Sequence, residues 1–255
     1  MPGGALEVLD IITGILGSSV AAVYLHGSAV RGGLRKDSDV DILAVVECDL
    51  ADETRRLLTD RLLKTSGQIG NRDGLRCLEV TVVKLSDIVP WRYPAKIQFQ
   101  YGEWLREGFE AGLIQETYDD PDLAIILSQI NQHSVALIGD DAYSMLDQVP
   151  RADLHEAIAD SLSSLMAGIN GDERNVILTL ARMWATVESG VFLPKDKAAE
   201  WAGSFVTKEQ RVLLELAASA YRGECTDDWS GIDDQLRELA AVMEGEIKSR
   251  VCCGK

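Results

Sequence analysis

Hydrophobic positions in the first 150 residues alternate between helical and strand spacing. Helical spacing predicts amphipathic helices over residues 5–17, 52–66 and 121–138. The predicted buried face of the first helix carries Leu6, Leu9, Ile12 and Leu16. Short runs rich in apolar and β-branched side chains predict strands at residues 21–25, 40–46 and 77–83.

After Pro150 the strand pattern stops and only helical spacing remains. Residues that favour helix ends mark the expected boundaries: Asp153 with Glu156, Asp172, Gly190, Thr207 with Gln210, and Gly223. A last helix is expected over residues 231–250. We therefore predict two domains, an α/β domain with a mixed sheet at residues 1–150 and an all-α helical bundle at residues 151–255.

The stretch "HGSAVRGGLRKDSDVDIL" from His26 to Leu43 carries the most distinctive chemistry. Asp39 and Asp41 are two positions apart, so both side chains project from one face of a strand. Two carboxylates at this spacing repel each other unless a cation joins them, and oxygen ligands suit a hard divalent ion such as Mg²⁺. The alternative is that both aspartates are exposed turn residues.

The turn before these aspartates has the composition of a phosphate cradle. Gly27 allows close backbone approach, Ser28 offers a hydroxyl and an N–H, and Gly32 and Gly33 permit unusual backbone angles. No Gly-Lys-[Ser/Thr] follows, so this is not a Walker P-loop. Ser28 could also cap a helix starting near Ala29.

Glu79, in "CLEVTVV", is a third candidate carboxylate. A glutamate among β-branched residues is costly to bury without a partner. If its strand neighbours the strand of Asp39 and Asp41, Glu79 reaches the same metal site. Otherwise Glu79 is an exposed edge residue.

Composition narrows the function classes. The chain has 255 residues and a net charge of −16, which argues against a nucleic-acid partner and is compatible with a cationic ligand. No segment reaches the roughly 18 apolar residues of a membrane span, and the N-terminus has no basic region typical of a signal peptide. The five cysteines lack the paired spacing of a zinc site, so we expect reduced thiols, including the adjacent Cys252 and Cys253, in a cytoplasmic protein.

Gly-Ser, a gap of about ten residues, Asp-x-Asp and a later acidic strand residue resemble the signature of the nucleotidyltransferase superfamily. Further segments resemble the aminoglycoside adenylyltransferases that act on spectinomycin. They are "VPWRYP", "YGEWLRE", "DPDLAIIL", "GDERNVILTLARMW" and "PKDKAAEWA". The resemblance covers roughly residues 20–225. It implies a nucleotidyltransferase domain followed by a helical domain that completes the ATP and antibiotic sites.

The resemblance implies that AMP passes from ATP to the 9-hydroxyl of spectinomycin and that pyrophosphate leaves, with two Mg²⁺ ions. Asp39, Asp41 and Glu79 match the metal-binding residues, and Glu79 also matches the catalytic base. Residues matching nucleotide contacts are Ser28, Ser38, Arg182, Lys195 and Tyr221, and Gly27 lies beside them in the cradle. Residues matching antibiotic contacts are Trp104, Asp172 and Asn175.

Simpler roles remain open for several of these residues. Lys195 and Arg182 could be surface cations, Trp104 could be a packing residue, and Asp172 could be only a helix cap. His26 replaces an aromatic residue that is usual before Gly-Ser, and we interpret it as a packing residue.

Within the family, Ser163 and Gly168 stand where enzymes acting on both streptomycin and spectinomycin have a Trp and an Asp. The chain therefore resembles the branch that modifies spectinomycin alone. The alternatives are a dual streptomycin 3″ and spectinomycin 9 enzyme, transfer to another small or protein acceptor, and a non-catalytic nucleotide or drug binder. We expect a monomer without a nucleic-acid or membrane partner.

Overall fold

The computed structural model describes residues 4–31, Arg35, 38–71 and 74–253, with the backbone alone at Cys253. The predicted cradle glycines Gly32 and Gly33 and the side chain of Cys253 lie outside this part. The chain divides into two compact units, residues 1–149 and 150–255.

The N-terminal unit is built on a mixed sheet, as predicted. The described residues form a six-stranded sheet in the order β5-β4-β3-β2-β1-β6. Its strands are β1 (Val20–His26), β2 (Val40–Val46), β3 (Leu78–Lys84), β4 (Ala95–Tyr101), β5 (Tyr118–Asp120) and β6 (Val135–Ile138). Strands β2 and β3 are parallel, and the other neighbouring pairs are antiparallel.

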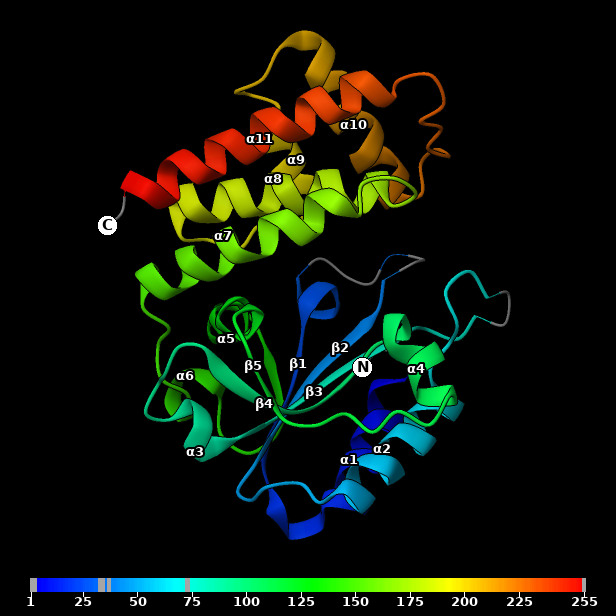
Figure 1. The fold of residues 1–255 in the computed structure, drawn as a ribbon, viewed down its shortest axis with the longest axis vertical. Helices are drawn as coiled ribbons and strands as arrows, with labels where there is room; N and C mark the ends of the chain where they lie inside the picture. Colours follow the sequence, from blue (N-terminus) through cyan, green and yellow to red (C-terminus); the bar gives the residue numbers. More distant parts are fainter. Residues whose placement is uncertain (1–3, 32–34, 36–37, 72–73, 254–255) are drawn as a thin grey trace. The chain divides into compact units, whose positions relative to one another are not determined.

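Helices cover both faces of this sheet, so its central strands are buried on both sides (Figure 1). One face packs on α1 (Ala5–Leu16) and α2 (Asp52–Thr65). The other packs on α3 (Leu85–Ile88), α5 (Asp122–Gln132) and α6 (Ala142–Met145). Shorter elements are α4 (Arg106–Glu110) and the 3₁₀ turns η1 (Gly17–Ser19), η2 (Gly27–Val30) and η3 (Glu103–Leu105).

Three expectations for this unit need correction. Leu6 is exposed, because α1 buries Ala5 and Val8 beside the predicted Ile12 and Leu16. The helix predicted over 121–138 ends at Gln132, and its tail pairs with β1 as strand β6. Strand β4 was not predicted, although its period-two alternation of Ile97, Phe99 and Tyr101 is a strand signal.

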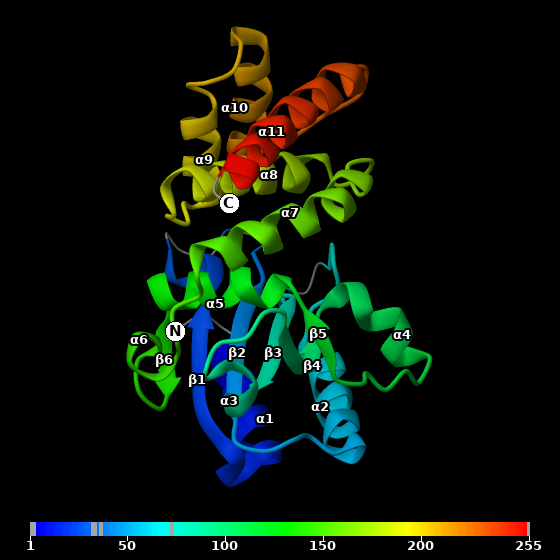
Figure 2. The same cartoon turned by 60° about the vertical axis from the view of Figure 1, so that its left-hand side comes forward.

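The C-terminal unit is helical (Figure 2). Its helices are α7 (Arg151–Ala167), α8 (Glu173–Ser189), α9 (Lys195–Ala202), α10 (Lys208–Arg222) and α11 (Asp233–Cys253). Helix α8 packs against α9, α10 and α11, and it contributes the buried Trp184. The bundle predicted from sequence is therefore present, with α9 as an additional helix.

Helix boundaries in this unit follow most of the predicted signals. Thr207 and Gln210 form a reciprocal capping box, and α8 and α10 end at Gly190 and Gly223 in the left-handed conformation. The helix start expected at Asp153 with Glu156 is wrong, because α7 already begins at Arg151 after Pro150 and has no side-chain cap.

Adjacent leucines on α2 allow a matched test of this packing. Leu58 is 0% exposed and Leu57 is 49% exposed. Leu58→Ala should lower the free energy of unfolding by about 2–5 kcal/mol, because it leaves a cavity between helix and sheet. Leu57→Ala should cost much less. Thermal unfolding of both variants, followed by circular dichroism, checks this, and equal losses would contradict the observed face of α2.

Candidate active site

Two of the predicted carboxylates lie side by side at one end of the sheet. Asp41 is the direct partner of Glu79 in the parallel pairing of β2 with β3. Partners in register project from the same face of a sheet. Val40 and Ile42, on the opposite face of β2, are fully buried in the core with α1 and α2. The strand of Glu79 therefore neighbours the strand of Asp41, as a shared metal site requires.

Strand β1 brings the glycine turn against the same carboxylate. His26 pairs with Asp41 from the other side, and Gly27 begins the turn η2. A Cβ added at Gly27 would lie 1.8 Å from Oδ2 of Asp41, and Gly27 has φ of 68°. Only glycine therefore fits between the turn and the carboxylate. Ser28 lies inside η2 rather than at a helix cap, and His26 caps that turn without a side-chain hydrogen bond.

His26 is only 7% exposed, and burial lowers its pKa to about 4, so the ring is neutral at pH 7. Its Nδ1 has no hydrogen-bond partner among the residues that the structure describes. A neutral, buried ring agrees with a packing role beside Asp41.

Arg76 anchors the backbone just before Asp39. Its Nη1 donates to the carbonyl oxygens of Arg35 at 2.7 Å and Ser38 at 2.9 Å. The hydroxyl of Ser38, a predicted phosphate contact, is buried and accepts a hydrogen bond from the N–H of Arg35 at 3.0 Å. Sequence reasoning missed Arg76, because a single cation before a strand carries no spacing signal.

The chemistry of this donor set suits a hard cation. Asp39, Asp41 and Glu79 offer only carboxylate oxygens, which Mg²⁺ prefers, and Mg²⁺ commonly completes its shell with water and phosphate oxygens. Within the described ranges, no group of three His, Cys, Asp or Glu side chains is close enough to hold a metal by itself. These carboxylates would therefore need further oxygen ligands, such as those of a triphosphate, to complete a magnesium site.

In the C-terminal unit, three predicted site residues form one hydrogen-bonded chain. Lys195 Nζ donates to Oδ1 of Asn175 at 2.5 Å, and Nδ2 of Asn175 donates to Oδ2 of Asp172 at 2.9 Å. Asp172 is the N-cap residue of α8 but makes no capping hydrogen bond with its side chain. Lys195 opens α9, so the first turns of two helices meet here.

The remaining predicted residues lie on separate elements. Arg182 is half-buried in α8, and Tyr221 is half-buried near the end of α10. Trp104 is exposed in η3 of the N-terminal unit. A Cβ added at Gly102 would lie 2.3 Å from its indole ring, so the ring rests on the backbone of Gly102.

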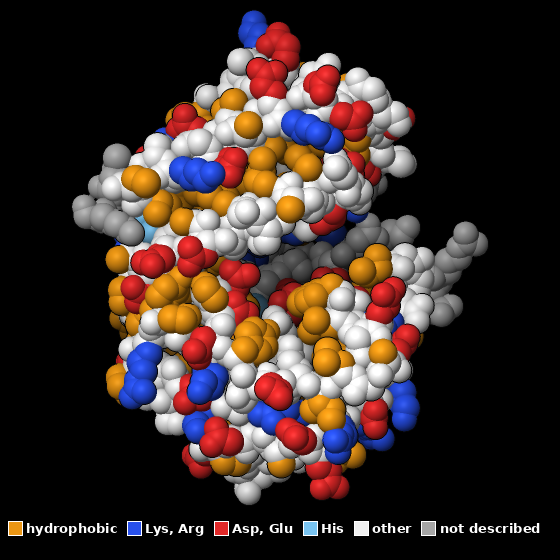
Figure 3. All heavy atoms as spheres, viewed as in Figure 1, with side chains coloured by type: hydrophobic (Ala, Val, Ile, Leu, Met, Phe, Trp, Pro, Cys, Tyr) orange, Lys and Arg blue, Asp and Glu red, His pale blue; other side chains and the backbone are white. Residues whose placement is uncertain are grey.

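Surface charge is mixed on the one face of the molecule that Figure 3 shows. On the face seen in Figure 3, acidic, basic and hydrophobic side chains are intermixed over each unit. No helix in the described part of the chain is both long and apolar enough to cross a bilayer.

Known proteins match this chain over nearly its full length. Residues 8–105 match the nucleotidyltransferase domain family, and residues 144–246 match the C-terminal domain of aminoglycoside adenylyltransferases. A spectinomycin 9-adenylyltransferase of Staphylococcus aureus is 52% identical over 98% of this chain and 96% of its own length. An aminoglycoside (3″)(9) adenylyltransferase of Escherichia coli is 42% identical over 94% of this chain and 92% of its own.

A solved structure extends the similarity to the fold. The crystal structure of a spectinomycin adenyltransferase from Enterococcus faecialis with ATP and spectinomycin matches with a TM-score of 0.91. The two are 32% identical, and the match covers 96% of this chain and 98% of that one.

The contact between Gly27 and Asp41 can be tested with a matched glycine. Gly27→Ala should weaken binding of magnesium–ATP by at least ~10-fold, because the added methyl group displaces the carboxylate of Asp41, an expected magnesium ligand. Gly17 also has positive φ, 56°, but no atom lies within 4 Å of an added Cβ. Gly17→Ala should therefore share the backbone strain and leave binding unchanged. Titration calorimetry measures both, and wild-type affinity in Gly27→Ala would contradict the geometry.

Proposed function

The chain belongs to the aminoglycoside adenylyltransferase family, and from that premise we propose that it transfers AMP from ATP to the 9-hydroxyl of spectinomycin. Pyrophosphate leaves, and the modified drug loses its action, so the protein confers antibiotic resistance. The observation that carries this proposal is the pairing of Asp41 with Glu79 directly beside the Gly27 turn. Carboxylates beside a phosphate-binding turn are the groups that nucleotidyl transfer needs.

Glu79 is the proposed general base. Its carboxylate accepts the proton of the 9-hydroxyl, the alkoxide attacks the α-phosphorus in line, and the bond to pyrophosphate breaks. Asp39 and Asp41, with Glu79, would hold two Mg²⁺ ions, which neutralise phosphate charge during transfer. The backbone of Gly27 and the hydroxyls of Ser28 and Ser38 are the proposed phosphate contacts.

The remaining proposed contacts come from the C-terminal unit, except for Trp104 of the N-terminal unit. Lys195 and Arg182 stabilise negative charge on the departing pyrophosphate, and Tyr221 contacts the nucleotide. Trp104, Asp172 and Asn175 bind the antibiotic. The hydrogen-bonded chain from Lys195 through Asn175 to Asp172 supports this assignment, because it orients a nucleotide residue and two antibiotic residues together.

We further propose that the enzyme works as a cytoplasmic monomer, with no nucleic-acid or membrane partner. The cysteines whose side chains the structure describes, Cys48, Cys77, Cys225 and Cys252, are free thiols, which suits a reducing compartment. ATP and magnesium are available in the same compartment.

Release of pyrophosphate from ATP tests the reaction and the base together. We expect release with spectinomycin and neither with streptomycin nor without an acceptor. Glu79→Gln should lower turnover by at least ~10²-fold, because it removes the base at constant size. Glu53→Gln, an exposed glutamate on α2, is the control. Near wild-type turnover in Glu79→Gln would eliminate Glu79 as the base.

A dual enzyme for streptomycin and spectinomycin is the second candidate, since relatives of both kinds match the chain. Ser163 is exposed on α7, and Gly168, the C-cap of α7, has φ of −82° and room for a Cβ. The double variant Ser163→Trp with Gly168→Asp therefore folds without strain and should gain streptomycin-dependent release of pyrophosphate. No gain would show that these positions do not suffice, and release by the wild type would favour the dual enzyme.

A further inference from the structure

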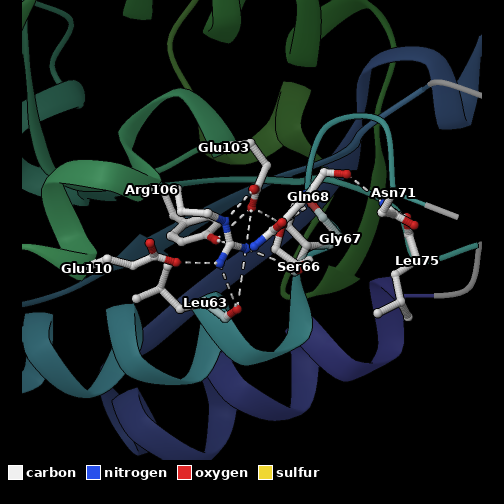
Figure 4. Close-up of polar contacts among 11 residues, drawn as sticks. Leu63, Ser66, Gly67, Gln68, Asn71, Leu75, Glu103, Arg106 and Glu110 are labelled. Carbon is white, nitrogen blue, oxygen red and sulfur yellow. Dashed lines mark hydrogen bonds and ion pairs between the residues drawn. The ribbon is translucent and has the colours of Figure 1, made fainter. Parts of the chain in front are cut away.

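A buried ionic network lies beneath the end of the sheet that carries Glu79. Glu103 is its centre, with a side chain only 4% exposed, while that of its partner Arg106 is 14% exposed (Figure 4). Arg106 binds both carboxylate oxygens, through Nε at 2.6 Å and Nη2 at 2.9 Å. The hydroxyls of Ser66 and Tyr101 donate to Oε1 at 2.5 Å and 2.8 Å. A buried charge is tolerated here because four donors satisfy it.

The network reaches both chain neighbours of Glu79. The Ser66 hydroxyl, which donates to Glu103, also accepts the N–H of Leu78 at 3.1 Å. On the other side, Val80 is the register partner of Tyr101, whose hydroxyl donates to Glu103. Leu78 is therefore linked to the Glu103 carboxylate through Ser66, and Val80 is linked to it through Tyr101.

The network also supports Trp104 and the end of α2. Trp104 follows Glu103 directly and is 58% exposed, so the exposed indole ring is next in sequence to the buried Glu103 carboxylate. Arg106 Nη2 donates to the carbonyl oxygens of Ser66 at 3.2 Å and Leu63 at 3.4 Å. These carbonyls belong to the last turn of α2 and the residue after it, where a cation is favourable.

We propose that Glu103, clamped by Arg106, is a positioning residue that holds Glu79 and Trp104 in the arrangement that adenylyl transfer requires. This inference rests on the proposed function, since it assigns Glu79 to the reacting hydroxyl and Trp104 to the antibiotic. We assign Glu103 no substrate contact, because its buried carboxylate faces Arg106, Ser66 and Tyr101. It acts through the backbone of β3 and through the turn η3.

The charge on Glu103 is what the network depends on. Burial acts to raise the pKa of Glu103, but hydrogen bonds from Arg106, Ser66 and Tyr101 outweigh it and keep the pKa below its ordinary value. A glutamine at this position has one acceptor oxygen, and its amide would face a donor. Glu103→Gln therefore breaks part of the network at nearly constant volume.

The main test compares Glu103→Gln with a buried arginine that lies away from Glu79. Arg55 on α2 is buried, donates to the Gln98 carbonyl at 3.0 Å and pairs with Asp52 at 3.0 Å. Both Glu103→Gln and Arg55→Gln should lower the thermal midpoint. Only Glu103→Gln should reduce kcat for spectinomycin-dependent pyrophosphate release, by ~10–100-fold, which is the usual loss when a contact that orients an active-site residue is removed. Only Glu103→Gln should also raise KM for spectinomycin.

A readout independent of activity follows Trp104 itself. The protein labelled with 5-fluorotryptophan has five tryptophans, and Trp104→Phe assigns the resonance of Trp104 in its ¹⁹F spectrum. Glu103→Gln should shift or broaden that resonance and speed amide hydrogen exchange at residues 78–80. Arg55→Gln should do neither. If Glu103→Gln lowers stability but leaves kcat, KM and the Trp104 resonance unchanged, the network is only structural and the proposal is wrong.

Two milder variants cover the case in which Glu103→Gln does not fold. Tyr101→Phe and Ser66→Ala each remove one donor and keep the ion pair. Each should give a smaller loss of kcat and a smaller resonance shift, and unchanged values in both would overturn the proposal. A wild-type protein that releases no pyrophosphate with spectinomycin would refute the proposed function, while the resonance and exchange measurements would still decide the positioning role.

Discussion

The parallel pairing of β2 with β3 is the constraint on which the site depends. Because side chains alternate along a strand, the register that sets Asp41 opposite Glu79 also buries Val40, Ile42, Leu78 and Val80 against α1 and α2. A slip of one residue would send a carboxylate into this core. Hydrophobic burial therefore fixes the distance between two carboxylates that would otherwise repel each other.

The contacts around this pairing hold the backbone segments that carry the carboxylates in place. Gly27 allows η2 to reach the carboxylate of Asp41, and Arg76 holds the carbonyls before Asp39. Glu103 and Arg106 anchor the backbone on the other side of β3. Such support suits a reaction whose rate depends on holding the attacking hydroxyl in line with the phosphorus.

The sequence predicted the features that local pattern encodes. The strand at residues 40–46 and the helix start at Thr207 follow from the sequence, because a strand alternates its faces and residues at a helix start have a fixed spacing. Strand β6 was missed, because its pairing with β1 comes from tertiary contact rather than from its own periodicity. Which face of α1 is buried also depended on the sheet beneath it.

The candidate site likewise combines residues that a local sequence pattern reveals with residues that only the fold brings together. The Asp-x-Asp spacing indicated a metal-binding pair, but only the sheet register could place Glu79 beside Asp41. The Glu103–Arg106 pair had a signal, since Glu and Arg three residues apart in "YGEWLRE" meet on one face of a helical turn. Its link to Leu78 through Ser66 joins residues far apart in sequence, so no local pattern reveals it.

A double-mutant cycle on Asp41 and Glu79 tests the central claim, that the register joins these two carboxylates into one catalytic site. The quantity to measure is spectinomycin-dependent pyrophosphate release in Asp41→Asn, Glu79→Gln and the double variant. Groups that act as a unit are strongly non-additive, so the double variant should lose little more activity than the worse single variant. If the logarithms of the two single losses simply add, the carboxylates act independently and do not form one catalytic site.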